Sequence, residues 1–282
     1  MLEISSIKNE KIKEVALLLE RSRLRREKGL FVVEGFREVS NCIQNGFDIE
    51  SIFFNPDIIA PAAIAALCAD RHIFSVTPEV YARIAYREGT EGVVAVVREK
   101  RLRLDDIILY REDTPSVKGI NPGEAQTVSG HNPLILVAES VEKPGNLGAL
   151  LRTADACGVD AVLICDPLTD LYNPNLIRSS LGGIFTKQVV ACTSREAYAW
   201  LAEKKITIFT AQLQDARWYY DADFIQSCAL VMGSEANGLS QFWQDVSQAK
   251  IKIPMLGQLD SLNVSVSAAV LCYEAVRQRM PE

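Results

Sequence analysis

The feature that most constrains this chain is the alternation of short apolar segments with helical segments over residues 133–282. Six apolar segments bounded by turn residues predict strands: "LILVAES", "DAVLICD", "QVVAC", "KITIFTAQ", "CALVMG" and "KIKIPM". Helical periodicity occupies the intervals, at 145–157, 174–182, 194–204, 238–246 and about 262–279. This alternation predicts an α/β domain whose largely parallel sheet carries helices on both faces. In such sheets ligands bind at the carboxyl ends of the strands.

The first hundred residues predict a second, smaller α/β unit. Strands are predicted in "GLFVVEG", "IESIFFN", "HIFSVT" and "EGVVAVVRE", and helices in "IKEVALLLERSRLRRE", "FREVSNCIQNG" and "PAAIAALCAD". Residues 101–132 are polar and rich in Gly, Pro, Ser and Thr, so we interpret them as a linker or a surface excursion. Because 282 residues exceed the usual size of one core, we expect two domains, 1–100 and 133–282.

Composition narrows the classes of site that the chain can carry. The seven cysteines are dispersed and never form C-x-x-C, which predicts reduced thiols in a cytoplasmic protein. Two distant histidines give little basis for a metal site or a Ser-His-Asp triad, and we expect no metal. No apolar run approaches a membrane span, and the N-terminus does not resemble a signal peptide. The net charge of −6 means that nucleic acid would need a local basic patch.

One such patch is "RSRLRREKG", which follows the amphipathic segment "IKEVALLLE". Four arginines at positions 21, 23, 25 and 26 crowd this segment. Its simplest interpretation is a solvated, charged helix face. The alternative is a local contact with phosphate groups, and the residues by themselves leave both open.

The turn after the first strand of 133–282, in "KPGNLGALLRTADACGV", lacks both the G-x-G-x-x-G and P-loop patterns. Gly148 and Arg152 are four residues apart and share one helix face. Gly148 would leave space there for another molecule to lie close to Arg152. Asn146 is placed to cap the helix or to offer its amide to a ligand. The alternative is an ordinary capped helix in which Arg152 pairs with Asp155.

Two further turns follow predicted strands. In "ALVMGSEANGLS" the strand ends at Gly233, and Glu235 follows at the rim of the sheet, where it could also be an ordinary N-terminal helix charge. In "IKIPMLGQLDSLNVSVSAAV" the strand ends in Ile253-Pro254-Met255, and Ser261 is predicted to cap the last helix, with Asn263 at its second position. The helical spacing of one set of residues predicts the core-facing side of that helix: Leu262, Val266, Ala269, Val270, Tyr273 and Val276. Together the turns predict a pocket for a flat, polar ligand with apolar edges.

These three turns resemble, in the same order, the three motifs of the SpoU (TrmH-like) RNA 2′-O-ribose methyltransferases of the SPOUT superfamily. The matching stretches are "KPGNLGALLRTADACGV", "LVMGSEANGLS" and "IPMLGQLDSLNVSVSAAV". In residues 1–100, "GLFVVEGFREVSNCIQNGFDIESIFF" is similar, less specifically, to the L30e-like substrate-binding domain of the family. The resemblance implies a SPOUT domain with a deep trefoil knot, S-adenosylmethionine (SAM) as cofactor, RNA as substrate and a homodimer.

The resemblance also implies roles for particular residues. It assigns SAM binding, mainly through backbone groups, to Gly233, Ile253, Met255, Leu262 and Asn263. Gly233 would permit the cofactor to approach closely. It assigns catalysis and RNA contact to Asn146, Arg152, Glu235, Ser261 and Asn263. With RNA as substrate, the arginines of the basic segment become candidate phosphate contacts: Arg21, Arg23, Arg25 and Arg26.

The implied reaction is an in-line displacement in which a ribose 2′-oxygen attacks the methyl group of the sulfonium. The family proposal that the matching arginine acts as the base is chemically awkward, because a guanidinium is not readily deprotonated. We instead expect Arg152 to bind the phosphate beside the target ribose and to stabilise negative charge on the 2′-oxygen. Glu235 and Asn146 would orient Arg152 and the ribose, and a phosphate or a water could serve as the base.

Several alternatives stay open at this point. The N-terminal domain favours ribosomal RNA over transfer RNA by fold-level analogy only. DNA is disfavoured because the 2′-hydroxyl is the reacting group. The chain could be a catalytically silent RNA-binding protein, or a SPOUT enzyme that methylates a base nitrogen. A nicotinamide dehydrogenase is the weakest alternative, because the dinucleotide fingerprint is lacking.

Overall fold

The computed structural model describes residues 2–67, 72–86, 91–109 and 132–280. Two compact units are present. The first contains Met1–Arg101, Lys143–Arg152 and Leu168–Thr186, and the second contains Leu102–Glu142, Thr153–Pro167 and Lys187–Glu282. Most of the predicted excursion, 110–131, lies outside the described residues. No helix in the described ranges is both long and apolar enough to cross a membrane.

The first unit contains a mixed five-stranded sheet in the order β1-β4-β3-β5-β2. Its strands are β1 (Leu2–Ile4), β2 (Leu30–Glu34), β3 (Ile49–Phe54), β4 (His72–Val76) and β5 (Val93–Arg98). β4 pairs in parallel with β1 and β3, whereas β5 is antiparallel to both β3 and β2. The four strands predicted from sequence are confirmed. β1 was not predicted, because three residues are too few to show a period.

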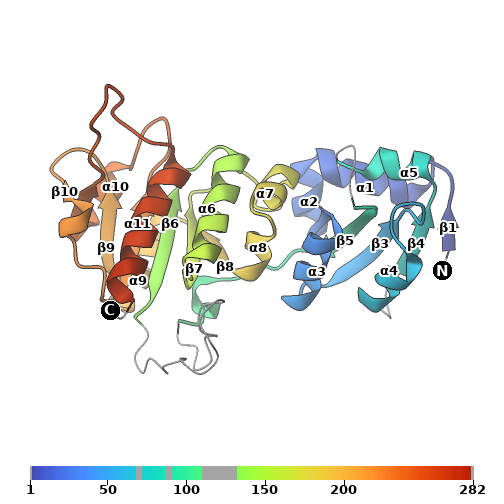
Figure 1. The fold of residues 1–282 in the computed structure, drawn as a ribbon, viewed down its shortest axis with the longest axis horizontal. Coiled ribbons are helices and arrows are strands. Elements are labelled where there is room, and N and C mark those ends of the chain that lie inside the picture. Colours follow the sequence, from blue (N-terminus) through green and yellow to red (C-terminus); the bar gives the residue numbers. More distant parts are fainter. Residues whose placement is uncertain (1, 68–71, 87–90, 110–131, 281–282) are drawn as a thin grey trace. The chain divides into compact units, whose positions relative to one another are not determined.

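The helices of this unit pack on both faces of the sheet. α1 (Glu10–Glu20) and α5 (Pro78–Ile84) lie on one face, and α3 (Phe36–Gln44) and α4 (Pro61–Leu67) lie on the other (Figure 1). The predicted continuous first helix is wrong. The extended backbone of Arg21, with φ −112° and ψ 105°, separates α1 from α2 (Ser22–Lys28). The unpredicted α5 begins with a recognisable signal, Thr77 as N-cap before Pro78.

The second unit contains a seven-stranded sheet in the order β10-β12-β9-β11-β6-β7-β8, and every pairing in it is parallel. Its strands are β6 (Leu134–Glu139), β7 (Ala161–Cys165), β8 (Gln188–Cys192), β9 (Thr207–Ala211), β10 (Arg217–Trp218), β11 (Cys228–Met232) and β12 (Ala249–Lys252). The predicted parallel sheet is confirmed. Only the two-residue β10 was missed.

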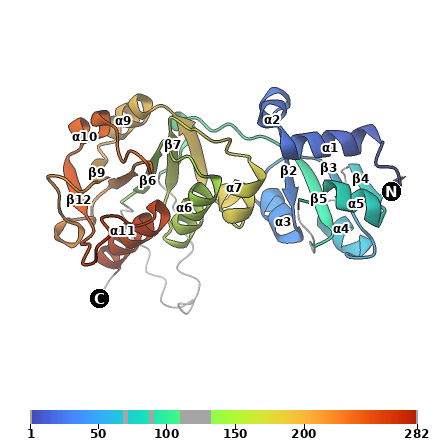
Figure 2. The same ribbon diagram turned by 90° about the horizontal axis from the view of Figure 1, so that it is seen from above.

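Helices cover both faces of this sheet as well. α9 (Ser194–Glu203) and α10 (Gln241–Val246) lie on one face, and α11 (Val264–Arg279) lies on the other (Figure 2). Trp200 of α9 and Trp243 of α10 are buried in one cluster with residues of the central strands. Burial of these large aromatic side chains against the strands anchors both helices.

The predicted core-facing side of α11 is wrong. The residues that this helix buries are Val264, Ala268, Leu271, Cys272 and Ala275. Val266 and Tyr273, which were expected in the core, are 47% and 52% exposed. Two sides of α11 are apolar, so periodicity alone could not identify the buried one.

α6 (Pro144–Ala156) carries the first motif, and its early turns pack closely against α7 (Pro174–Ser179). A Cβ on Gly148 would lie 1.9 Å from Ser179 Oγ and 2.9 Å from the carbonyl oxygen of Leu176. Gly148 is therefore needed for the approach of two helices. The prediction that it leaves space for another molecule is wrong, because α7 fills that space.

Replacement of Gly148 by alanine should therefore destabilise the protein. We expect Gly148→Ala to lower the free energy of unfolding by about 1–3 kcal/mol, the usual cost of overpacking. The measurement is the shift in the midpoint of chemical denaturation. Gly145→Ala, in the first turn of the same helix, is the matched control, because its Cβ would meet no atom within 4 Å. Equal shifts for both variants would contradict this account of Gly148.

Candidate active site

The loop after β11 folds back on itself directly behind the strand. Ser234 and Gly238 exchange two backbone hydrogen bonds of 3.0 Å each. A Cβ on Gly233 would lie 2.2 Å from the carbonyl carbon of Gly238, so no other residue fits there without a shift of the loop. Gly233 was expected to let a cofactor approach closely. In the structure, the backbone of its own loop occupies the space beside Gly233. Glu235 is exposed beyond this turn.

The loop after β12 runs from residue 253 to residue 263. Ile253 and Met255 are partly buried, whereas Ser261, Leu262 and Asn263 are exposed. Asn263 caps α11, because its Oδ1 accepts hydrogen bonds from the backbone N–H of Ser265 at 3.0 Å and from Ser265 Oγ at 2.6 Å. The predictions that Ser261 is the N-cap and that Asn263 lies inside the helix are therefore wrong.

The topology brings these two loops to the same edge of the second unit. β12, β9 and β11 are consecutive parallel strands, so the turns that follow them leave from one side of the sheet. Four leucines of these turns expose large apolar side chains: Leu213 (52%), Leu256 (97%), Leu259 (76%) and Leu262 (41%). Backbone-rich turns beside exposed apolar side chains are the kind of surface that suits a flat ligand with polar groups and apolar edges.

The first-motif residues lie on α6, which follows the carboxyl end of β6. Asn146 lies within the first turn, where its N–H donates to the carbonyl of Lys143 at 3.0 Å, so it is not the capping residue. Arg152 is exposed and forms no ion pair within the described residues. Asp155, its suggested alternative partner, instead forms an ion pair with Lys187, whose Nζ lies 3.6 Å from Asp155 Oδ1. The guanidinium of Arg152 is therefore available to an external anion.

A buried carboxylate that the sequence analysis missed holds the second-motif loop. Glu139, the last residue of β6, is only 5% exposed. Its carboxylate accepts from the Ser240 N–H at 2.8 Å and from Ser240 Oγ at 2.6 Å. These two bonds tie the end of the loop to the end of the neighbouring strand. A signal was available, because Glu139 is the one charged residue in the apolar run "LILVAES".

Ser194, at the start of α9, joins this carboxylate to a second one. Its Oγ lies 3.2 Å from Glu139 Oε1 and 2.6 Å from Asp166 Oδ2, and it accepts from Trp243 Nε1 at 3.0 Å. A hydroxyl has one proton to donate, so the shorter contact with Asp166 takes it. Glu139 therefore depends mainly on Ser240 for its hydrogen bonds.

Removal of the Glu139 carboxylate should loosen the second-motif loop. We expect Glu139→Ala to speed amide exchange at Ser240 by about tenfold or more, because one lost charge-assisted hydrogen bond costs about 1.5–3 kcal/mol. Hydrogen–deuterium exchange measured by NMR would resolve that amide. Glu142→Ala, three residues later on the exposed side of the turn, is the control. Unchanged exchange at Ser240 would show that the carboxylate does not hold the loop.

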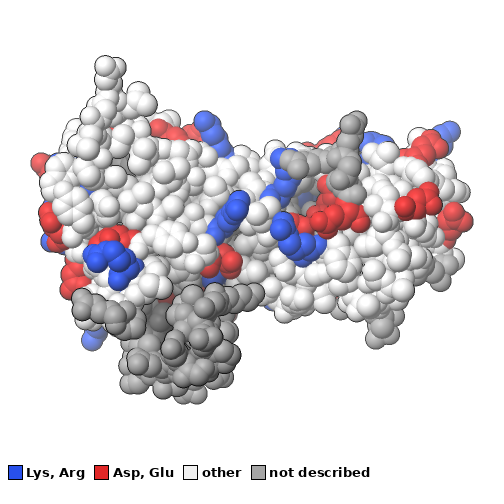
Figure 3. Space-filling model, viewed as in Figure 1, with Lys and Arg blue, Asp and Glu red and all other residues white. Residues whose placement is uncertain are grey.

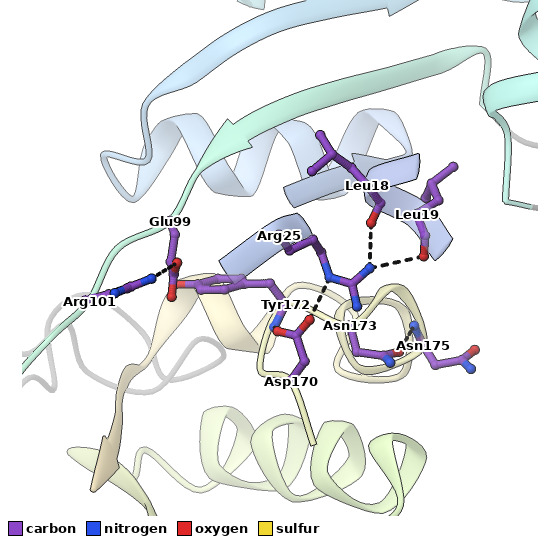
Figure 4. Close-up of polar contacts among 9 residues, drawn as sticks. All are labelled: Leu18, Leu19, Arg25, Glu99, Arg101, Asp170, Tyr172, Asn173 and Asn175. Atoms are coloured by element: carbon purple, nitrogen blue, oxygen red, sulfur yellow. Dashed lines mark hydrogen bonds and ion pairs between the residues drawn. The ribbon is translucent and has the colours of Figure 1, made fainter. Parts of the chain in front are cut away.

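One of the four predicted phosphate-binding arginines has a structural role instead. Arg25 is 4% exposed, and its Nε donates to Asp170 Oδ2 at 2.6 Å (Figure 4). Its Nη1 donates to the backbone carbonyls of Leu18 and Leu19 at 2.5 and 3.1 Å. A guanidinium that is buried and satisfied in this way cannot also contact RNA, so the prediction for Arg25 is wrong. Arg21, Arg23 and Arg26 are exposed.

Tyr172 extends the buried contact around Arg25. Its ring stacks on Phe31 with centroids 4.1 Å apart, and its hydroxyl donates to the carbonyl of Lys100 at 2.8 Å. Burial raises the pKa of the Tyr172 phenol, which keeps it a neutral donor. The segment 168–186 is thus held against the rest of the first unit by one ion pair and by aromatic packing.

The Arg25–Asp170 pair should contribute far more to stability than its exposed neighbour. We expect Arg25→Ala to lower the free energy of unfolding by about 3–5 kcal/mol, because a buried carboxylate loses its partner. Arg23→Ala removes an exposed pair with Glu27 on the same helix and should cost at most about 0.5 kcal/mol. Thermal and chemical denaturation of both variants test this difference. Similar losses would show that burial does not distinguish the two pairs.

Charge is dispersed over the face drawn in Figure 3. Lys and Arg side chains form separate spots there, several of them beside Asp or Glu. This agrees with the net charge of −6. Any anionic polymer would be held on this face by local groups of cations and not by a continuous basic surface.

Comparison with known proteins identifies the class to which this fold and these loops belong. A crystal structure of an RNA 2′-O ribose methyltransferase superposes with a TM-score of 0.78 at 34% identity, over 99% of both chains. The SpoU methyltransferase AviRb from Streptomyces viridochromogenes in complex with AdoMet gives a TM-score of 0.81 at 26% identity, over 96% of this chain and 98% of AviRb. The fold is therefore that of the SPOUT methyltransferases, as predicted.

Sequence relatives place the chain within that class. The SpoU rRNA Methylase family model matches residues 133–273, and an MRM3-like substrate binding domain matches residues 9–95. The chain is 32% identical to the 23S rRNA (guanosine-2′-O-)-methyltransferase RlmB of Bordetella pertussis, over 75% of this chain and 80% of RlmB. It is 25% identical to RlmP of Bacillus subtilis, over 97% of this chain and 98% of RlmP. The chain belongs to the SpoU rRNA methylase family.

Proposed function

We propose that this protein is a SAM-dependent methyltransferase that modifies a ribose 2′-oxygen of ribosomal RNA. The observation that carries the proposal is Arg152, which lies in a complete first motif, is exposed and has no ion-pair partner in the described part of the chain. The two other motifs form loops at the carboxyl edge of the parallel sheet. Membership of the SpoU rRNA methylase family supports the reaction class.

SAM fits the loops at that edge. The exposed leucines of the turns offer apolar surface for an adenine, and the turns supply backbone N–H and C=O groups. The residues that would hold SAM are Gly233, Ile253, Met255, Leu262 and Asn263. When bound, SAM supplies an activated methyl group on a positively charged sulfur. An AdoMet complex of AviRb, a relative with the same fold, supports this choice of cofactor.

The substrate side of the reaction is assigned to α6 and the second-motif loop. Arg152 binds the phosphate beside the target ribose and stabilises negative charge that develops on its 2′-oxygen. It is not assigned as the base, because guanidinium groups in general are poor proton acceptors. Asn146, Glu235 and Ser261 orient the ribose and the guanidinium. A phosphate oxygen or a water takes the proton from the 2′-hydroxyl.

Ribosomal RNA is favoured over transfer RNA as the substrate. RlmB, RlmP and a 23S rRNA (uridine(2479)-2′-O)-methyltransferase of Streptomyces viridochromogenes all match over three quarters of this chain or more. A tRNA (guanosine(18)-2′-O)-methyltransferase of Thermus thermophilus matches 52% of it. The MRM3-like substrate binding domain would hold the RNA, with Arg21, Arg23 and Arg26 as phosphate contacts.

A homodimer completes the proposal. The outer side of α11 exposes Val266 and Tyr273, and an apolar helix face of this kind is usually covered by a partner. We assign residues 1–100 to substrate binding, residues 101–132 to a linker and residues 133–282 to a knotted catalytic domain. We place the enzyme in the cytoplasm. DNA, which lacks the 2′-hydroxyl, is not a substrate.

Replacement of Arg152 tests the proposed mechanism. Arg152→Ala should lower kcat for methyl transfer from radiolabelled SAM to unmodified 23S rRNA by about 10²–10³-fold, the usual cost of losing one charge-stabilising donor. Arg152→Lys keeps the charge but loses the planar fork, so it should recover only part of the rate. Transfer RNA and DNA transcripts are the substrate controls, and nuclease digestion should yield a 2′-O-methyl nucleoside.

The outcomes separate the competing functions. Radiolabel in transfer RNA alone would show that transfer RNA, and not ribosomal RNA, is the substrate. Label recovered on a base nitrogen would contradict ribose chemistry. SAM binding without label in any RNA would indicate a ribonucleoprotein substrate, whereas failure to bind SAM would favour a silent RNA-binding protein. Wild-type turnover in Arg152→Lys would show that bidentate geometry is not needed.

A further inference from the structure

The outer edge of the seven-stranded sheet carries an aromatic and cationic cluster that the proposed mechanism does not use. β10 is the edge strand, and its Trp218 is 39% exposed. Tyr220, in the short helical turn that follows, is 49% exposed. The two rings are nearly parallel, with centroids 6.4 Å apart and an interplanar angle of 23°. Two large aromatic side chains therefore present their surfaces to solvent at one place.

A cation lies over one of these rings. Lys252 Nζ lies 4.7 Å from the centre of the Trp218 ring, a cation–π contact. Trp218 is paired with Lys252 in the sheet register, and Lys250 is two residues before Lys252, so the three side chains share one face of the edge. Within the described chain, Lys250, Lys252 and Arg217 form no ion pair, although exposed acidic residues lie in the neighbouring turns: Asp215, Asp221 and Asp223.

The position of this cluster ties it to the candidate active site. Trp218 and Lys252 are the last residues of two neighbouring parallel strands, so both lie at the carboxyl edge. Ile253, which follows Lys252 directly, begins the loop assigned to SAM. A ligand that rests on Trp218 would therefore lie beside the cofactor loop.

Protection of an exposed sheet edge does not explain these residues. Edge strands are commonly blunted by lysine to prevent pairing with another chain. Here both lysines lie on β12, which is already paired on both sides, while the edge strand itself exposes a tryptophan. An exposed tryptophan would favour association and not prevent it. The combination instead matches nucleic-acid surfaces, in which bases stack on aromatic rings and cations hold the phosphates.

We propose that Trp218, Tyr220 and Lys252 form a stacking site for unpaired bases of the RNA substrate next to the target nucleotide. This inference rests on the proposed function, because it names where that RNA is held. Trp218 and Tyr220 stack on bases without reading their sequence, since every base has an aromatic face. Lys252, with Lys250 on the same face of β12, contacts the phosphates. The site thus favours single-stranded RNA over a duplex, whose bases are already stacked.

The protein contains its own reporter for this site. Of its three tryptophans, Trp200 and Trp243 are 4% and 0% exposed, so Trp218 alone can meet a ligand. Titration with a short oligouridylate should quench tryptophan fluorescence in a saturable way. The same titration of Trp218→Phe, which keeps a ring for stacking, should show binding by anisotropy of labelled RNA but little quenching. Absence of quenching in the wild-type protein would overturn the proposal.

Binding measurements separate the stacking contribution from the phosphate contribution. Trp218→Ala should weaken binding of the oligouridylate by about 5- to 100-fold, the range expected for one lost base stack, with the salt dependence unchanged. Lys252→Gln should reduce the slope of log K against log salt by about one phosphate. Arg195→Gln removes a cation that lies 5.3 Å above the ring of Phe242 elsewhere in the same unit, and it should change neither quantity. Wild-type affinity in both Trp218→Ala and Tyr220→Ala would overturn the proposal.

Two further readouts keep this inference distinct from the proposed function. SAM binding by equilibrium dialysis should be the same for the wild-type protein and Trp218→Ala, so a loss of methyl transfer to 23S rRNA would arise from RNA binding alone. If the wild-type protein quenches with RNA but transfers no methyl group, the stacking site stands and the methyltransferase proposal fails. If Trp218→Ala instead converts a dimer to a monomer in sedimentation, the patch is a contact between two copies and the proposal is overturned.

Discussion

The parallel direction of all seven strands in the second unit is the constraint on which the candidate site depends. Because every pairing is parallel, each strand delivers its following turn to the same edge of the sheet. The loops of the second and third sequence motifs, which follow β11 and β12, can then contribute to one edge of this unit. The parallel direction of the strands, more than any single residue, determines which side chains are brought to the site. A mixed sheet would have divided the same motifs between two ends.

The turns at that edge need internal support, because their backbone groups are not paired in the sheet. The support of these turns comes from different hydrogen bonds. Ser234 and Gly238 pair with each other, Asn263 caps α11, and Glu139 accepts both donors of Ser240. A nearly buried carboxylate held by neutral donors is costly unless its hydrogen bonds are complete. Its presence at the end of β6 therefore fixes one arrangement of the loop, and loss of a donor would leave the charge unsatisfied.

The sequence predicted the sheet well because long apolar strands have a clear signal. β1 and β10 were missed because two or three residues show no period. The buried side of α11 was mistaken because the helix is apolar on two sides, and only packing decides which side the sheet covers. Arg25 could not be distinguished from its neighbours, since its partner Asp170 is 145 residues away and local charge patterns do not contain that information.

The glycines illustrate a different limit of prediction from sequence. Gly148 and Gly233 were singled out correctly, but both were interpreted as space for a ligand. In the structure a neighbouring helix occupies the space beside Gly148, and the returning loop occupies the space beside Gly233. A glycine in a sequence shows that something must come close, and it does not show whether that is a ligand or the protein itself. A residue whose side chain is exposed and forms no ion pair within the described residues, such as Arg152, is therefore a better indicator of an external ligand. An ionised group without an internal partner stays in solvent at little cost, and it keeps its full attraction for a phosphate.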